Sequence, residues 1–269
     1  MAIKLIATDL NGTLLHGDQS YNQELLQVTL RHLAAKGITL VLSSGNQYAH
    51  LQQLFAPVMA DNLAVVAENG ASIYLKGQQV FDGSLTPEQV QHFVTVDWQR
   101  DYLRASYLIL VGQQGSYTQT GAPQALIDAA EKFYDHLQQV DDLSMVTDRI
   151  KKISVSTTSK QSRQLVTQIN ADFDGELRAH DSGYGVADVV AGNVGKLQAV
   201  QWLAQRFNVN SDEIMAFGDG ANDVPLLQFV GEGWAMCNAK PEIQAAATHT
   251  TAIDNDHDGV LKTITERIL

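Results

Sequence analysis

The chain has 269 residues, 45% of them hydrophobic, and a formal net charge of −12. This length and composition predict a globular protein with one large domain or two ordinary ones. The negative charge argues against general affinity for nucleic acid or anionic membranes, and no apolar run approaches the roughly 20 residues that span a bilayer.

The first predicted strand covers residues 5–8 and ends on Asp9. Its apolar run is typical of a buried parallel strand, and open α/β sheets bind ligands at the carboxyl ends of such strands. Asp9 and Asn11 are two positions apart, so on an extended segment they point the same way. Gly12 permits a tight turn with backbone N–H groups facing an anion. Taken alone, Asp-x-Asn-Gly is more typical of a plain turn.

Strand and helix patterns then alternate through the first third of the chain. Apolar residues recur with a helical period between residues 21 and 36, and Gly37 terminates this helix. The next expected elements are a strand at 39–42, a helix at about 48–55, a strand at 63–67 and a hairpin of strands at 72–75 and 80–82. Such alternation predicts a parallel sheet flanked by helices.

The strand expected at 39–42 runs into Ser44-Gly45-Asn46. Small hydroxyl and amide donors at the end of a buried strand suit phosphate oxygens, although a lone serine in this position would usually be a surface residue. The strand at 63–67 is followed by Glu68-Asn69-Gly70-Ala71, which predicts a turn.

The middle of the chain has a different pattern. Thr86 is the expected N-cap of a helix with Pro87 in its first position. The further elements expected here are strands at 107–111, 153–157 and 186–190 and helices near 122–134 and 162–171. Lys151 and Lys152 lie before the second of these strands and either bring positive charge to a binding site or mark a solvated strand end.

The last third returns to the earlier alternation. The expected elements are helices at 196–207, 224–229 and from about 241, and strands at 214–217, 233–236 and 248–251. The helix at 196–207 opens with Lys196, a cation available to a phosphate and to carboxylates. The strand at 214–217 runs into Gly218-Asp219-Gly220-Ala221-Asn222-Asp223. Two parallel strands that both end in carboxylates can bring Asp9 and Asp219 together around a hard cation such as Mg²⁺.

Together these motifs resemble those of the haloacid dehalogenase (HAD) superfamily, in particular its Cof-type sugar-phosphatase branch. The segments that carry the resemblance span essentially the whole chain: Asp9-Leu10-Asn11-Gly12-Thr13, Ser44-Gly45-Asn46, Glu68-Asn69-Gly70-Ala71, Lys196 and Gly218-Asp219-Gly220-Ala221-Asn222-Asp223. The resemblance implies an α/β fold: a Rossmann-like parallel-sheet core of residues 1–82 and 192–269, with an inserted α/β cap domain at 83–191. Composition alone is also compatible with one continuous sheet.

The resemblance also implies a mechanism of covalent phosphoryl transfer. Asp9 attacks phosphorus and forms an aspartyl-phosphate, which water then hydrolyses. The implied ligands of Mg²⁺ are the Asp9 and Asp219 carboxylates and the backbone carbonyl of Asn11. The implied phosphate-binding residues are Ser44, Gly45, Asn46, Lys196 and Asn222. Asp223 is expected to orient the metal site or Lys196, and a helix N-cap is the alternative role for Asn222 or Asp223.

Asn11 is a departure from the family pattern, which normally has a second aspartate at this position. An amide can neither protonate a leaving alkoxide nor deprotonate water. The leading hypothesis is therefore a Mg²⁺-dependent phosphatase of small phosphorylated metabolites, most plausibly hexose or pentose phosphates, with Asn11 as a catalytic handicap. The alternatives are a sugar phosphotransferase and a weakened phosphometabolite-binding protein.

The remaining expectations concern location, assembly and isolated residues. The single cysteine, Cys237, excludes an internal disulfide, and we expect it to be buried and inert. The amino terminus runs directly into a strand without a secretory signal, so we expect a cytoplasmic protein, a monomer or weak homo-oligomer. His16 is more typical of an exposed loop than of a substrate contact. A cap loop at 180–185 and an acidic turn at 254–259 are weaker site candidates.

Overall fold

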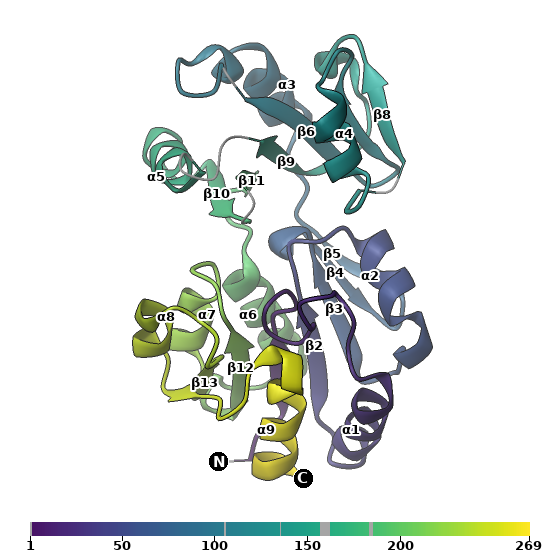
Figure 1. The fold of residues 1–269 in the computed structure, drawn as a ribbon, viewed down its shortest axis with the longest axis vertical. Helices are drawn as coiled ribbons and strands as arrows, with labels where there is room; N and C mark the ends of the chain where they lie inside the picture. Colours follow the sequence, from purple (N-terminus) through teal and green to yellow (C-terminus); the bar gives the residue numbers. More distant parts are fainter. Residues whose placement is uncertain (1, 105, 135, 157–161, 183–184) are drawn as a thin grey trace.

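The computed structural model describes residues 2–104, 106–134, 136–156, 162–182 and 185–269. Within these ranges the strands form one sheet of eight and one of six. Figure 1 shows the two sheets in separate halves of the molecule, with both termini in the half that holds the larger sheet. The α/β fold class predicted from the alternating pattern is confirmed.

The larger sheet has the strand order β14-β13-β12-β1-β2-β3-β4-β5. Its strands are β1 (Leu5–Thr8), β2 (Thr39–Ser43), β3 (Leu63–Ala67), β4 (Ser72–Leu75), β5 (Gln78–Asp82), β12 (Ile214–Gly218), β13 (Glu232–Ala235) and β14 (His249–Thr250). The strands from β14 to β3 are parallel, whereas β4 and β5 are antiparallel additions at one edge. The central strands β1, β3 and β12 are buried throughout, because helices cover both faces of a parallel sheet.

The helices of this half are α1 (Gln23–Ala35), α2 (Tyr48–Phe55), α6 (Lys196–Phe207), α7 (Val224–Phe229), α8 (Pro241–Ala246) and α9 (Gly259–Ile268). Two of them begin at residues typical of a helix start. The Asn22 side chain accepts from the Leu25 N–H at the start of α1, and Pro241 occupies the first position of α8. No helix in the described ranges is long and apolar enough to cross a membrane.

The smaller sheet has the order β10-β11-β9-β6-β7-β8 and is mostly antiparallel. Its strands are β6 (Tyr107–Gly112), β7 (Ser116–Gln119), β8 (Leu137–Val140), β9 (Ile150–Ser156), β10 (Leu177–Asp181) and β11 (Val186–Ala191). The helices of this half are α3 (Pro87–Thr95), α4 (Gln124–Ala130) and α5 (Ser162–Asp172). The Thr86 capping box at the start of α3 is present, with Thr86 and Gln89 bonded reciprocally.

The chain passes from the larger to the smaller sheet after β5 and returns after β11 (Figure 1). The two passages lie side by side, since a methyl group on Gly83 would be 2.7 Å from Val194 Cγ2. The described strands form two sheets, so the alternative of one continuous sheet was wrong. The assignment of 1–82 with 192–269 to a core domain and of 83–191 to a cap domain stays a prediction, and we use "core" and "cap" for these segments below.

Several details differ from the sequence predictions. Strands β7, β8 and β10 were not anticipated, and the helix expected near 122–134 is limited to α4. Thr157, the last residue of one expected strand, lies outside the described residues. Cys237 is exposed, so the expectation of a buried thiol was wrong. It follows Met236, where β13 has ended and the chain turns toward the surface before α8.

Candidate active site

Three strands of the larger sheet place the candidate residues at one edge. β1 lies between β12 and β2, and Thr8 is in register with both Phe217 and Leu42. The three parallel strands therefore end at the same level, which brings the loops that follow them together. Asp9 follows β1, residues 44–46 follow β2 and Asp219 follows β12.

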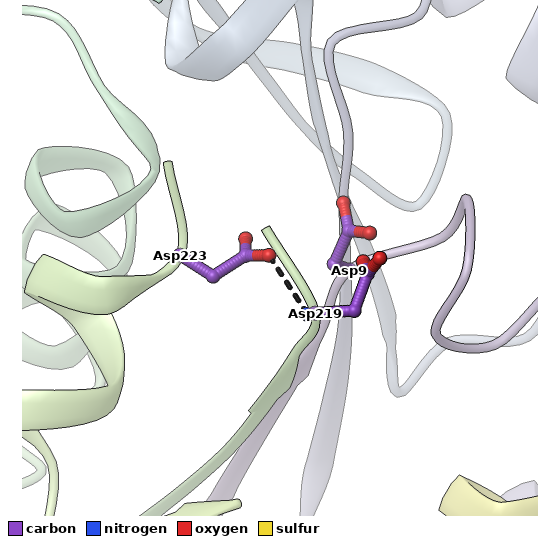
Figure 2. Close-up of side chains that lie close together, drawn as sticks. All are labelled: Asp9, Asp219 and Asp223. Atoms are coloured by element: carbon purple, nitrogen blue, oxygen red, sulfur yellow. Dashed lines mark hydrogen bonds between the residues drawn. The ribbon is translucent and has the colours of Figure 1, made fainter. Parts of the chain in front are cut away.

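Asp9, Asp219 and Asp223 form a compact group that we call the acidic cluster. One carboxylate oxygen from each lies within 4.8 Å of the others, and no other such group of three metal-type ligands occurs in the part of the chain that the structure describes. Figure 2 shows the carboxylates of Asp9 and Asp219 side by side, with Asp223 approaching from α7. Carboxylate oxygens are the ligands that hard divalent cations prefer.

Lys196 supplies positive charge to the cluster from the first position of α6. Its buried ammonium group donates to Asp9 Oδ1 and, over 2.7 Å, to Asp223 Oδ1. Burial would lower the pKa of Lys196, but the neighbouring Asp223 and Asp9 carboxylates hold it above its usual value. The lysine is therefore a cation, and one cation faces three carboxyl groups.

The pKa of Asp9 is raised, because the group is buried in a site that holds more carboxyl groups than cations. Burial raises this pKa, Lys196 lowers it, and the neighbouring Asp223 and Asp219 raise it again, to about 7. The pKa of Asp219 is raised too, chiefly by burial and by Asp223. A proton or a further cation is needed to hold such a pair of carboxylates together, and oxygen donors of this kind fit a divalent cation.

The loop after β1 is shaped around Asp219. Gly12 has φ +75°, and a methyl group at this position would lie 2.5 Å from Asp219 Oδ2. The neighbouring Thr13 hydroxyl donates to Asp219 Oδ1 over 3.0 Å. A glycine is therefore required here both by the left-handed backbone and by the closeness of the carboxylate. Asn11, just before it, has an exposed side chain.

Asp223 holds the turn after β12. Its Oδ2 accepts from the backbone N–H groups of Asp219 and Gly220 at 3.2 and 3.0 Å, while Oδ1 accepts from Lys196. Asp223 occupies the N-cap position of α7, but its side chain makes no capping hydrogen bond there. Its contacts therefore favour the predicted orienting role over the N-cap alternative. Asn222 is half-buried beside Gly220.

Residues 44–46, which we call the Ser44 loop, present polar groups at the same edge. Ser44 is buried, and its Oγ accepts from the Asn46 N–H over 3.1 Å. The side-chain nitrogen of Asn46 is buried and has no hydrogen-bond acceptor among the described residues. Burying an unpaired donor is costly, so this amide suits an anionic ligand oxygen.

The other sequence candidates lie elsewhere or make different contacts. His16 bonds to Ser20 and Asp258, and the acidic turn at 254–259 contributes to no metal-type group in the described ranges. The predicted cap loop is described only in part, because residues 183 and 184 lie outside the described ranges. Lys151 and Lys152 are both buried, so the alternative of a solvated strand end was wrong.

Asp188 is a buried carboxylate that sequence reasoning missed. It lies in β11 and pairs with Lys152 over 2.7 Å. The signal for it was available, because a single carboxylate interrupts an otherwise apolar strand, and a buried carboxylate requires partners.

Comparisons with known proteins identify relatives along almost the whole chain. Residues 6–264 match the model of the haloacid dehalogenase-like hydrolase family. The chain is 31% identical over 268 residues to 5-amino-6-(5-phospho-D-ribitylamino)uracil phosphatase YbjI of Escherichia coli (strain K12), covering 98% of this chain and 96% of that protein. It is 27% identical to HMP-PP phosphatase of Klebsiella pneumoniae (strain 342), covering 96% and 93%. The crystal structure of SMU.1108c from Streptococcus mutans UA159 superposes with a TM-score of 0.92 at 30% identity, covering 98% of both chains.

Proposed function

This chain belongs to the haloacid dehalogenase-like hydrolases, and from that membership we propose that it is a Mg²⁺-dependent phosphatase of small phosphorylated metabolites with Asp9 as its nucleophile. The family resemblance predicted from the motifs is confirmed, and its named relatives are phosphatases. The observation that carries the finer proposal is the acidic cluster. Asp9 follows β1, beside a second carboxylate and in contact with a buried lysine.

The residues present fit a magnesium ion. The Asp9 and Asp219 carboxylates and the Asn11 backbone carbonyl would hold it, and the amide side chain of Asn11 leaves that carbonyl unchanged. When bound, the cation neutralises charge between an anionic nucleophile and an anionic phosphate and orients the phosphate. The pKa of about 7 for Asp9 supports this assignment, because the cluster lacks the positive charge needed to keep this carboxylate ionised.

Asp9, Lys196 and the Ser44 loop have separate roles in the proposed phosphoryl transfer. The Asp9 carboxylate attacks phosphorus and displaces the leaving-group oxygen, and water later attacks the aspartyl-phosphate. Lys196 uses two of its N–H donors on Asp9 and Asp223 in the described structure, which leaves the third for a phosphoryl oxygen. The Ser44 loop, through its hydroxyl and the free Asn46 amide, offers donors to the other oxygens.

We further propose that the leaving group is a polyhydroxylated chain or sugar. The name of the Escherichia coli relative specifies a phosphate ester on a ribityl chain. Such an alkoxide is a poor leaving group and needs a proton. Because Asn11 cannot supply one, this residue favours a second candidate, in which the chain binds phosphorylated metabolites and turns them over only slowly.

Phosphate release from a panel of substrates tests both candidates. The panel contains ribitol 5-phosphate, ribose 5-phosphate, glucose 6-phosphate and 4-nitrophenyl phosphate, each with Mg²⁺ and with excess chelator, and Asp9→Asn is the control. We expect Mg²⁺-dependent release by the wild type and none by the variant. Binding of the sugar phosphates without release would support the second candidate, and release that survives chelation would contradict the assignment of Mg²⁺. Transfer of phosphate to an added sugar acceptor would indicate the phosphotransferase.

A further inference from the structure

Two polar side chains of the cap approach the core next to the Ser44 loop. Lys152, in β9, donates from Nζ to the Gly45 carbonyl over 2.9 Å. Asp188, in β11, accepts from Asn69 Nδ2 over 2.9 Å. Asn69 belongs to a short helical turn, η2 (Glu68–Gly70), which follows β3. Lys152 and Asp188 bond to one another over 2.7 Å, so we call them the seam pair.

The seam pair is almost completely enclosed, with side-chain exposures of 4% and 1%. Asp188 also accepts from the hydroxyls of Ser154 and Ser182 at 2.5 and 2.6 Å. The Lys152 ammonium lies 5.2 Å from the centre of the Tyr134 ring. Lys152 therefore bonds to one acceptor in the core and one in the cap, and an aromatic ring packs against it.

Both members of the pair are ionised. Burial would lower the pKa of Lys152, but Asp188 raises it above the usual value. Burial would raise the pKa of Asp188, but Lys152 and the two serine hydroxyls hold it below the usual value. A buried ion pair of this kind adds little net stability over an apolar pair of equal volume. What an apolar pair could not provide are the hydrogen bonds to the core, from Lys152 to the Gly45 carbonyl and from Asn69 to Asp188.

The Ser44 loop shows what these contacts do. Its three consecutive carbonyl groups are all bonded: Ser44 O to the Asn69 N–H, Gly45 O to Lys152, and Asn46 O to the Glu68 N–H. Two of these donors belong to η2 of the core, and the cap supplies the third. The turn that holds them is strained at Glu68 and Asn69, which have φ of +49° and +56°.

The bond from Lys152 fixes the direction of an N–H group. In a trans peptide the C=O and the next N–H point in opposite directions, so holding Gly45 O directs the Asn46 N–H the other way. That N–H donates to Ser44 Oγ. Because Ser44 Oγ accepts this bond, its own proton is available for an anionic ligand.

We propose that Lys152 is a positioning residue: held by Asp188, it fixes the Gly45–Asn46 peptide so that the Ser44 loop binds phosphate only while the cap is in contact with the core. This inference rests on the proposed function for the assignment of the loop to phosphate. Asn69 strengthens the contact by tying Asp188 to the turn that holds the other two carbonyls.

Lys151 provides a matched control. It precedes Lys152 in β9, is equally buried and also donates to a carboxylate, Asp82 Oδ1, over 2.7 Å. Lys151 lies at a register shift between β9 and β6, and its ammonium group donates to Asp82 rather than to the Gly45 carbonyl. Replacing it with methionine removes a buried lysine of the cap without touching the Gly45 carbonyl.

The test compares Lys152→Met with Lys151→Met in the full chain. Losing a hydrogen bond from a charged group typically lowers the population of the conformation that it stabilises by about tenfold or more, and apparent affinity falls in proportion. For Lys152→Met we expect inorganic phosphate to inhibit about tenfold more weakly and KM to rise by a similar factor, with a smaller change in kcat. For Lys151→Met we expect changes below about threefold. Of these two variants, only Lys152→Met should show faster hydrogen exchange of the Asn46 backbone N–H.

Two further variants separate positioning from folding. Lys152→Met/Asp188→Asn removes both charges, leaves no unpaired buried ion and keeps an acceptor for Asn69. Asn69→Gly removes the other contact while tolerating the positive φ. Both should fold, judged by their melting temperatures, and both should weaken phosphate binding. Wild-type phosphate binding and wild-type Asn46 exchange in the folded double variant would overturn the proposal.

The outcome also separates this inference from the proposed function. If the wild type neither hydrolyses any phosphate ester nor binds phosphate, the proposed function fails. Hydrogen exchange of the Asn46 backbone N–H in Lys152→Met would then still decide whether Lys152 positions the loop.

Discussion

The acidic cluster of the core, together with Lys196, and the seam pair of the cap both combine lysine with aspartate, yet their charges are balanced differently. In the core, one lysine faces three carboxyl groups, and the pKa of Asp9 rises to about 7. In the cap, one lysine faces one carboxylate that also accepts from two serines and an asparagine, and the pKa of Asp188 falls. A cluster with excess charge is suited to a ligand, whereas a balanced one is suited to holding structure.

Of the substitutions that test this comparison, removal of the proposed nucleophile Asp9 should have the largest effect on activity. Asp9→Asn should lower kcat for phosphate release by at least about 10⁴-fold, because it replaces an attacking carboxylate with an amide. It should not lower the melting temperature of the chelated protein, because it also removes one of the excess carboxyl groups. Kinetics and thermal melting of the same preparation measure both. A large loss of stability would show that Asp9 is structural.

Restoring the acid next to the cluster gives the second effect. Asn11→Asp should speed hydrolysis of a sugar phosphate by about 10²-fold, since a positioned general acid typically contributes 10² or more. Hydrolysis of 4-nitrophenyl phosphate should gain much less, because its leaving group needs little protonation. The ratio of the two gains is the measurement. Equal gains, or none, would mean that another group already donates the proton.

Mg²⁺ should stabilise the core but leave the seam pair unaffected. At a concentration of 100 times its Kd, a ligand of the folded state alone adds about 2.7 kcal/mol to the free energy of unfolding. Asp219→Asn should reduce the gain in melting temperature, whereas Lys151→Met should keep it. Denaturation with and without Mg²⁺ measures this gain, and an undiminished gain in Asp219→Asn would place the ion elsewhere.

The pH dependence of stability should have opposite signs in the two regions. Asp9 has a raised pKa, so between about pH 4 and 7 the folded metal-free protein holds a proton that the unfolded chain has released, and stability falls as pH rises. Asp188 has a lowered pKa, so its contribution is present above about pH 4 and is lost at lower pH.

Denaturant midpoints at pH 5 and 7.5, measured in chelator, test the fall in stability with pH that we expect from Asp9. Asp9→Asn should flatten it, and Asp9→Asn and wild type should differ least at pH 5. A wild-type midpoint that rises over this range and is unchanged by the substitution would contradict the expected charge balance.

The sequence predicted local features far better than distant partners. Asp9, Lys196 and Asp219 each lie at the end or start of an element that its own residues define, so their positions follow from local patterns. The β7 segment Ser116–Gln119 lacks the apolar alternation that identifies a strand, and its place depends on β6 and β8. The sequence showed Asp188 as a lone carboxylate in an apolar strand, but its partners Lys152 and Asn69 are distant in the chain and could not be predicted.

The two passages between the halves of the chain lie in contact at Gly83 and the buried Val194. Domains tolerate insertions where the two ends of the insert lie close together. The segment between them is therefore exchangeable in principle: a differently shaped insert could be grafted at this junction while the catalytic edge stays intact. On our proposal for Lys152, such a graft would also need a donor that reaches the Gly45 carbonyl.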